Sequence, residues 1–503
     1  MNARAFGPSP TGENFCTAEE AASRIQSGMT LATSGFAAAG YPKAVLHALA
    51  DRARSGEEIR VNFINSSNLG TEVESEWAET LLPSRLAPFQ MTPKCAGAIN
   101  KGSIEYVEMP LSRVAGAVRD GSLGEIDVAV IEALRITQEN ELVLTSGVGL
   151  SPLFVDHARQ IIVEINTSQP EELDGMHDIY RPGTGPGKAP IPLRGVSEKI
   201  GSTKLSFDPR KLLAVVVTDD KGVDVKYADP DALVQKFADN LFNFLEIERK
   251  RNPQWRSKLP PIQSGIGNMA NNLVKAFART DFKDLEFFCG LLQEANVELL
   301  AFGQAICASG SSVHTTERVR ELFCSDPRFY RERITLRPIE VSNCAEIIDR
   351  MGIVAMNSAV EIDLYGNANL SHIMGSKVVN GTGGGTTFAH NAGLSLMLLP
   401  STGKGGDIST IVPKAAVQDI CAHYIDVVIT DVGVADLRGK TPVERAKEII
   451  HNCVSPIYRD ALADYLRKSI EQVGGHEPQL LDECFEWHRR FRETGSMRPA
   501  GER

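Results

Sequence analysis

Two glycine-rich segments in the second half of the chain could bind an anion through backbone amides. The first, Gln263 to Ala270, reads QSGIGNMA and follows a proline-containing coil. The second, Asn380 to Thr387, reads NGTGGGTT and allows close approach of a ligand to the backbone. A helix that begins at such a turn presents unpaired N–H groups, which favour a phosphate or a developing oxyanion. Taken alone, the first segment is better explained as a tight turn before a helix, and the second as a flexible surface loop.

The composition excludes some other kinds of protein. The 503 residues are 42% hydrophobic and carry a net charge of −11, which argues against a nucleic-acid groove. The nine cysteines are scattered, without a C-x-x-C pair or a zinc spacing. No run of 18 apolar residues exists, and the first 15 residues lack the apolar core of a signal peptide. We therefore expect a cytoplasmic protein with reduced thiols, no metal and no membrane contact.

Short apolar runs alternate with helical patterns, which predicts an α/β fold with mainly parallel sheets. A capping box at Thr17 to Glu20 begins the first helix. The predicted strands are 29–33, 59–64, 126–131, 161–165, 212–218, 334–337, 353–357, 360–364, 394–399 and 425–430. The predicted helices include 42–54, 230–251, 271–279, 442–453 and 458–473. The pattern restarts after Asp229, so we expect two tandem domains, residues 1–225 and 226–503.

Motifs along nearly the whole chain resemble the acetyl-CoA hydrolase/transferase family of class I CoA-transferases. The glycine segment that begins at Asn380 continues to Phe388, as in the family pattern Asn-Gly-x-Gly-Gly-x-x-x-Phe. Pro400 to Gly406 reads PSTGKGG and is similar to the family's Pro-Ser-x-x-Lys-Gly-Gly. Further matching segments are Thr33–Phe36 with Gly40–Lys43, Gly175–Ile179, Val341–Asn343, Asp363–Asn367 and Ala435–Gly439.

The resemblance implies two CoA-transferase-like α/β domains, a coenzyme A thioester as substrate, no permanently bound cofactor, and a homodimer. It places the oxyanion hole on the backbone amides of Ile266 and Gly384, and an active-site asparagine at Asn343. The lysine within PSTGKGG also suits a phosphate or pantetheine contact. The CoA contacts that it implies are Gly265, Ile266, Gly267, Asn268, Met269, Val360, Asn380, Gly384 and Lys404.

The chain departs from the family pattern where the acyl and carboxylate groups would be handled. A strand after the first glycine turn carries the family's nucleophilic glutamate, and the ungapped counterpart here is Gly290. Asn68 stands where relatives have a small hydroxyl side chain. Asp431 replaces a glutamate and is one methylene shorter. The residues implied in CoA binding are kept, and the reacting residues differ.

Glycine supplies no nucleophile, so the covalent route cannot pass through position 290. Cys289 is adjacent, but alternation along a strand would turn it toward the core. Glu294 lies four residues on, one turn away if the segment is helical. A third alternative uses no enzyme nucleophile, because loss of the glutamate would leave a gap that faces the thioester carbonyl. We interpret His177 as a structural hydrogen-bonding residue.

The sequence therefore predicts an acyl-CoA-dependent enzyme that transfers the acyl group directly to water or a small-molecule acceptor. Positioning and a preorganised oxyanion hole can supply several kcal/mol of the barrier without a covalent step. One alternative is a carboxylate CoA-transferase with a relocated carboxylate, such as Glu294. Asp431 is a further candidate catalytic residue. The other is a non-catalytic protein that binds acyl-CoA.

Overall fold

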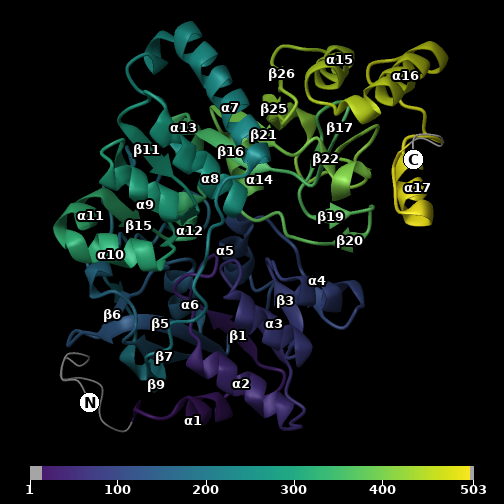
Figure 1. Cartoon of the computed structure of the whole chain (residues 1–503). Coiled ribbons are helices and arrows are strands. Elements are labelled where there is room, and N and C mark those ends of the chain that lie inside the picture. Colours follow the sequence, from purple (N-terminus) through teal and green to yellow (C-terminus); the bar gives the residue numbers. More distant parts are fainter. Residues whose placement is uncertain (1–13, 499–503) are drawn as a thin grey trace. The chain divides into compact units, whose positions relative to one another are not determined.

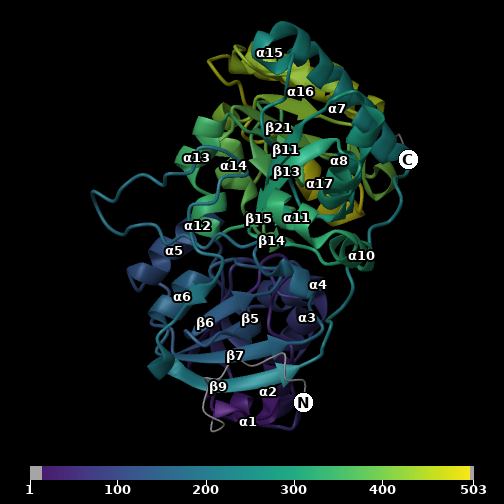
Figure 2. The same cartoon turned by 90° about the vertical axis from the view of Figure 1, so that its left-hand side faces the viewer.

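The computed structural model describes residues 14–498 and divides into two compact units. Unit 1 comprises the chain up to Tyr227 together with residues 284–351, and unit 2 comprises residues 228–283 and 352 onward. The chain passes between these units three times, after Tyr227, after Lys283 and after Met351, and the colours of Figures 1 and 2 follow its course. The domain boundary between residues 225 and 226 that the sequence analysis expects remains a prediction. The expectation about a leader peptide falls mostly on residues 1–13, outside the described residues.

Unit 1 contains a nine-stranded sheet in which β1, β2, β3, β4, β5, β7 and β9 run parallel. The antiparallel strands β6 and β8 extend one edge. The strands are β1 Thr30–Thr33, β2 Val61–Ile64, β3 Pro83–Ala87, β4 Glu105–Tyr106, β5 Val128–Ile136, β6 Glu141–Leu144, β7 Gln160–Asn166, β8 Leu205–Ser206 and β9 Leu212–Thr218. The helices are α1 Ala18–Ser23, α2 Ala44–Arg54, α3 Thr71–Glu79, α4 Pro93–Asn100, α5 Leu111–Arg119 and α6 Ser151–His157.

The second segment of unit 1 contains three parallel strands that are not part of the nine-stranded sheet. They are β11 Leu285–Phe288, β13 Ala305–Gly310 and β15 Ile334–Leu336. Short strands β12 Leu291–Leu292 and β14 Ser312–Val313 pair in parallel beyond the ends of β11 and β13. The helices of this segment are α9 Glu294–Ala301, α10 Glu317–Ser325, α11 Pro327–Arg333, α12 Ile339–Ser342 and α13 Ala345–Met351.

Unit 2 has parallel strands in the order β10, β16, β21, β25, with β26 antiparallel at the edge. They span β10 Ile262–Ser264, β16 Val354–Ser358, β21 Leu394–Leu398, β25 Val427–Ile429 and β26 Val434–Asp436. Smaller sheets contain β17 Glu361–Asp363, β18 Ala368–Asn369, β19 His372–Ile373, β20 Lys377–Val378, β22 Thr402–Gly403, β23 Ile408–Ser409 and β24 Ile411–Val412. The helices are α7 Ala232–Arg251, α8 Asn268–Ala276, α14 Gly385–Asn391, α15 Pro442–Asn452, α16 Pro456–Gln472 and α17 Glu486–Thr494.

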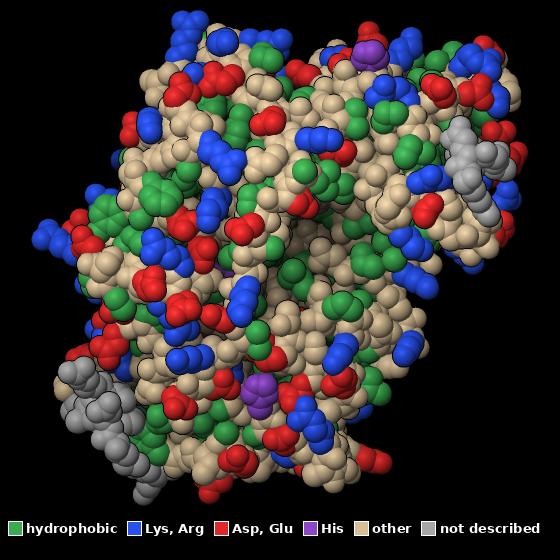
Figure 3. Space-filling view, in the orientation of Figure 1, with side chains coloured by type: hydrophobic (Ala, Val, Ile, Leu, Met, Phe, Trp, Pro, Cys, Tyr) green, Lys and Arg blue, Asp and Glu red, His purple; other side chains and the backbone are tan. Residues whose placement is uncertain are grey.

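The predicted fold class is confirmed: both units are α/β and their sheets are mainly parallel. Each predicted strand overlaps an observed one. Their ends agree within about two residues, which is the usual uncertainty of sequence-derived boundaries, except that β5 continues to Ile136, five residues beyond the predicted end. The capping box at Thr17 also forms, because its hydroxyl accepts the Glu20 N–H and the Glu20 carboxylate accepts the Thr17 N–H. No helix among the described residues is long and apolar enough to cross a membrane. Figure 3 shows charges of both signs interspersed over the visible face.

Candidate functional site

The first glycine turn joins β10 to helix α8 within unit 2. The Gly265 N–H donates to the Met356 carbonyl at 2.9 Å, which fixes the turn against β16. Gly267 is the N-cap residue of α8 and has φ 112°, a conformation that L-residues with side chains rarely adopt. Between them, the Ile266 N–H forms no hydrogen bond within residues 14–498, and its side chain is 40% exposed. The amide is therefore available to a ligand.

The second glycine turn precedes α14 and meets the first at the end of β16. Gly383 has φ 55° and Gly384 is the N-cap residue of α14, with an N–H that has no acceptor in the described part of the chain. Asn357 Oδ1 accepts from Gln263 Nε2 at 3.2 Å, and a Cβ on Gly385 would lie 3.1 Å from the same oxygen. One asparagine therefore contacts both turns.

Several polar atoms beside these turns are buried without a partner among the described residues. They include Asn357 Nδ2, a donor, and Asn380 Oδ1, an acceptor. Unpaired buried polar atoms are rare in native proteins and are typical of sites that a ligand or water completes. Among the other predicted contacts, the Val360 N–H is already bonded to the Asn369 carbonyl, and Asn268 Oδ1 accepts the Ala228 N–H.

Lys404 lies in the loop after β22 and is exposed. Its ammonium lies 4.9 Å from the centroid of the Phe491 ring and pairs with no carboxylate in residues 14–498. This leaves its charge free to meet a phosphate. Asp431 supports the same loop, because its carboxylate accepts the Ser401 N–H at 2.6 Å and the Ser401 hydroxyl at 3.2 Å. The contacts of Asp431 are thus those of a residue that positions the lysine loop.

Gly290 lies in unit 1, immediately after β11 and Cys289. Its carbonyl accepts the Ser311 N–H at 2.7 Å. A Cβ at this position would lie 3.2 Å from Cζ and 3.3 Å from Cε1 of Phe36. The expected gap at this position is therefore wrong in part: the Phe36 ring covers the space in which a side chain would begin.

The two alternative nucleophiles near Gly290 are both engaged elsewhere. Cys289 is fully buried, in agreement with its expected orientation toward the core. Glu294 is the first residue of α9, and its carboxylate accepts the hydroxyl of Thr316 at 2.6 Å. Thr316 is in turn the N-cap residue of α10. The structure thus gives Glu294 a local role between two helices.

The loop that carries Phe36 is held by β14 and the residue after it. Ala37 and Ala38 have φ of 52° and 62°, which costs energy for residues with a Cβ. Ser312 Oγ donates to the Phe36 carbonyl at 2.9 Å, and His314 Nε2 donates to the Ala37 carbonyl at 2.7 Å. These contacts fix the ring that covers Gly290.

His314 is neutral and has a defined tautomer. Burial lowers its pKa to about 4, since desolvation disfavours the charged ring. The Ala37 carbonyl can only accept, so Nε2 carries the proton and Nδ1 accepts the Tyr227 hydroxyl at 2.7 Å. His177 behaves similarly: it is buried, its pKa is lowered to about 4, and it donates to the Thr145 carbonyl. These contacts are consistent with a structural role for His177.

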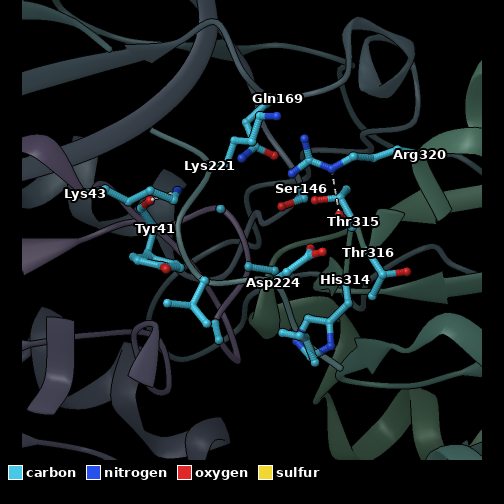
Figure 4. A pocket seen from close by; sticks show the side chains of 15 residues that line it. Tyr41, Lys43, Ser146, Gln169, Lys221, Asp224, His314, Thr315, Thr316 and Arg320 are labelled. Atoms are coloured by element: carbon cyan, nitrogen blue, oxygen red, sulfur yellow. Dashed lines mark hydrogen bonds between the residues drawn. The ribbon is translucent and has the colours of Figure 1, made fainter. Parts of the chain in front are cut away.

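A small polar cavity lies beside the same loop (Figure 4). It is lined by Tyr41 and Lys43 on one side and by His314, Thr315 and Arg320 on the other. Lys43 is bonded to buried Glu132, and the Arg320 guanidinium donates to the Thr315 carbonyl at 2.8 Å. The free space of about 30 Å³ suits one or two water molecules. We therefore do not place a substrate there.

Asn343 is connected to Gly290 through two serines of unit 1. Ser311, which binds the Gly290 carbonyl, shares a hydrogen bond of 2.8 Å with Ser342. The Ser342 hydroxyl also donates to Asn343 Oδ1 at 3.0 Å. Asn343 is only 2% exposed, yet its Nδ2 has no partner among the described residues. Asn68, also buried, uses its amide to bind the Leu69 carbonyl at 2.9 Å.

Comparison with known proteins identifies the family. Residues 9–225 match the acetyl-CoA hydrolase/transferase N-terminal domain, and residues 326–466 match the C-terminal domain. Succinyl-CoA:acetate CoA-transferase of Clostridium kluyveri is 38% identical over 489 residues, 97% of this chain and 90% of the relative. The chain belongs to the acetyl-CoA hydrolase/transferase family. Acetyl-CoA hydrolase of Schizosaccharomyces pombe is another member, 34% identical over 92% of each chain.

Solved structures agree with the fold of an acetyl-CoA hydrolase/transferase. RipA from Yersinia pestis superposes with a TM-score of 0.69 at 20% identity, over 91% of this chain and 97% of RipA. 4-Hydroxybutyrate CoA-transferase from Porphyromonas gingivalis gives 0.62 at 19% identity, over 91% and 98% of the two chains. At these identities the likeness describes the fold alone.

Residues that the sequence analysis did not single out lie close to the predicted ones. Phe36 was part of a matching segment, but nothing in its spacing predicted contact with Gly290. His314 and Ser312 follow a strand far from that segment in sequence. No cluster of three or more potential metal-ligating side chains occurs in residues 14–498.

Proposed function

We propose that this chain is an acyl-CoA-dependent enzyme that delivers the acyl group directly to water or a small-molecule acceptor. The observation that carries the proposal is the pair of unbonded backbone amides, Ile266 and Gly384, on two turns that meet at Asn357. Such amides suit the oxygen of a thioester as it becomes negative. The exposed charge of Lys404 supports a CoA phosphate or pantetheine contact.

The proposed step needs no covalent enzyme intermediate. The external nucleophile attacks the thioester carbonyl carbon, and the carbonyl electrons move onto oxygen, where the two N–H groups stabilise them. The carbonyl then re-forms and expels the CoA thiolate, which takes the proton that the nucleophile loses. The products are the acylated acceptor, or a free acid if the nucleophile is water, and CoA with a free thiol.

The contacts in unit 1 support the absence of a covalent step. By the resemblance, Gly290 stands at the position of the family nucleophile, and it has no side chain. Glu294 is bonded to Thr316, and Cys289 is buried at the end of β11. Use of either group would require a rearrangement of these contacts.

The test follows free thiol while intact mass is measured on the same sample. Native protein is mixed with acetyl-, propanoyl-, succinyl- and octanoyl-CoA, each with and without an added amine, alcohol or carboxylate. We expect thioester loss, equivalent free CoA and no CoA-sized adduct on the protein. An adduct that borohydride or hydroxylamine removes would replace the proposal with a carboxylate CoA-transferase. Tight binding without any thioester loss would make the protein non-catalytic.

A further inference from the structure

The loop that carries Lys404, residues 404–407 of unit 2, has an unfavourable backbone conformation. Lys404, Gly405 and Gly406 have φ of 49°, 66° and 94°, so three consecutive residues lie in the left-handed region between β22 and β23. Lysine has a Cβ, which makes this conformation costly for Lys404. Contacts from other parts of the chain must therefore maintain this lysine loop.

Arg498, near the end of the described chain, binds the lysine loop through its guanidinium. Its Nε donates to the Gly406 carbonyl at 3.2 Å, and its Nη2 donates to the Gly405 carbonyl at 3.3 Å. A Cβ on Gly406 would lie 2.7 Å from Nη2, so only glycine permits this close approach. The planar guanidinium thus orients two successive peptide units just after Lys404.

The carboxylate of the lysine loop, Asp407, contacts the same C-terminal residues. Its Oδ1 lies 3.5 Å from Nε of Arg498 and accepts the Ser496 hydroxyl at 2.9 Å. Its backbone carbonyl accepts the Met497 N–H at 2.7 Å. A carboxylate three residues from Lys404 would compete with a phosphate for the lysine ammonium. The pairing with Arg498 reduces that competition.

The residues that hold the lysine loop are anchored in the core of unit 2. Met497 is fully buried in the same core cluster as Tyr458, whose hydroxyl donates to the Gly406 carbonyl at 2.8 Å. The Arg490 guanidinium donates to the Met497 carbonyl at 3.1 Å and to the Arg498 carbonyl at 3.3 Å. Arg498 therefore extends from a fixed backbone to the exposed loop.

The side chain of Lys404 is oriented without being neutralised. Its ammonium lies 4.9 Å from the ring centroid of Phe491, which belongs to α17. A cation–π contact of this kind directs the ammonium and leaves its charge in place. In the part of the chain that the structure describes, no carboxylate pairs with it.

We propose that Arg498 is a positioning residue for CoA binding that acts through Lys404. It holds the carbonyls of Gly405 and Gly406 and engages Asp407, so that the Lys404 ammonium stays available to a phosphate of CoA. This role rests on the proposed function, because it takes CoA or its thioester as the ligand at Lys404. It involves no step of the acyl transfer itself.

Calorimetric titration of the full-length protein with free CoA measures this role without turnover. Arg498→Gln should raise the Kd for CoA about five-fold, as Lys404→Gln should. Because both substitutions affect one contact, the double variant should bind CoA about as weakly as either single variant. A double variant about 25-fold weaker than the native protein would mean that Arg498 binds CoA independently of Lys404, and would overturn the positioning role.

Two further variants separate this role from folding and from general charge. Arg498→Lys keeps a cation beside Asp407 but lacks the planar fork, so its Kd should lie between those of the native protein and Arg498→Gln. Should Arg498→Gln not fold, Arg498→Lys replaces it in the double-variant comparison.

Arg492→Gln is the matched control on α17. Arg492 is exposed, and its side chain forms no hydrogen bond or ion pair within residues 14–498. The control should bind CoA as the native protein does. Equal weakening by Arg492→Gln would overturn the proposal, as would native affinity of Arg498→Gln with unchanged far-UV circular dichroism.

The salt dependence of the same titrations tests whether Arg498 acts through the lysine charge. High salt should reduce the effects of Lys404→Gln and Arg498→Gln together, since screening weakens the contact of an exposed charge with a phosphate. An effect of Arg498→Gln that persists at high salt while that of Lys404→Gln disappears would overturn the proposal.

Failure of this role and failure of the proposed function give different results. Native protein that binds CoA but cleaves no thioester would refute the acyl transfer, and the double-variant titration would still decide the role of Arg498. In an active enzyme, Arg498→Gln should raise KM with little change in kcat. Thioester cleavage with KM unchanged in Arg498→Gln would retain the proposed function and refute the role of Arg498.

Discussion

The glycine turns of unit 2 and the strand end at Gly290 in unit 1 differ in the kind of group that would do chemistry. At Ile266 and Gly384 the available groups are backbone amides, whose positions depend on turn geometry and on Asn357. At Gly290 the reacting group expected from the family is a side chain, and the residue has none.

The two kinds of group, backbone amides and a reacting side chain, respond differently to substitution. A backbone N–H survives almost any change of side chain as long as the turn is kept. A nucleophilic carboxylate is lost by a single substitution, and a neighbour can then cover its place, as Phe36 covers the Cβ position of Gly290. A protein can therefore retain stabilisation of an oxyanion after the covalent step has gone.

The largest expected effect is a change of reaction on return of the carboxylate. Gly290→Glu alone places a Cβ 3.2 Å from the Phe36 ring, so we expect overpacking that costs roughly 1–3 kcal/mol. The double variant Gly290→Glu, Phe36→Leu removes that contact. With acyl-CoA it should form a CoA adduct that borohydride traps, measured as intact mass.

Gly290→Gln, Phe36→Leu is the matched control, because it has the same bulk without a carboxylate nucleophile. An adduct on both double variants, or on neither while both fold and bind acyl-CoA, would contradict the assignment of position 290.

The second-largest expected effect follows from removal of one backbone N–H, that of Gly384, from the second glycine turn. Gly384 has φ −87°, close to the range of proline, at the N-terminal end of α14. Gly384→Pro should lower kcat about 10²- to 10³-fold through loss of one oxyanion donor. Steady-state thioester cleavage measures it. Gly384→Ala keeps the N–H and should stay within about ten-fold of the native enzyme; an equal loss in both variants would mean that the amide is not the donor.

A smaller effect concerns the support of the Phe36 loop at low pH. The pKa of His314 is lowered to about 4 by burial, so the unfolded chain binds a proton as pH falls below 6.5 while the folded chain does not. Stability is therefore lost as pH falls from 6.5 to 4. This histidine should account for roughly 2 to 3 kcal/mol of the unfolding free energy lost between pH 7 and 4.5.

Urea unfolding of His314→Gln at the two pH values measures this contribution. The variant should lose correspondingly less stability on acidification, whereas His451→Gln, at an exposed position on α15, should behave as the native protein. An identical pH dependence of native protein and His314→Gln would show that the ring is protonated in the folded state at pH 4.5.

The smallest expected effect is on CoA affinity. Lys404→Gln removes an exposed charge and should raise KM for the thioester about five-fold with little change in kcat. The difference should shrink at high salt because screening weakens the interaction of exposed charges. Lys468→Gln, which breaks an ion pair with Asp464 on α16, is the control. A change in kcat without one in KM would place Lys404 in the reaction instead.

Much of the fold was predictable, because it depends on local patterns. The apolar runs of β5, β7 and β9 are buried strands, and the capping box at Thr17 satisfies helix N–H groups within four residues. The candidate turns were also predictable. Gly267 and Gly383 have positive φ angles, which glycine adopts more readily than other residues, so glycines in the sequence indicate such turns directly.

The surroundings of Gly290 were not predictable. Phe36 is more than 250 residues away in the chain, and the hydrogen bonds from Ser312 and His314 that place it join segments equally distant. Long-range packing determines such sites, and periodicity within one segment does not describe it.

The sequence by itself determined the α/β class, the family and the identity of the residue at position 290. It did so because periodicity, glycine placement and motif spacing are local properties of the chain. Only the tertiary structure decided that both turn amides lack a partner, that Phe36 covers Gly290, and that Asn343 presents an unpaired donor. The physical reason is that hydrogen-bond satisfaction and free volume depend on every neighbour in space, and most of those neighbours are remote in sequence.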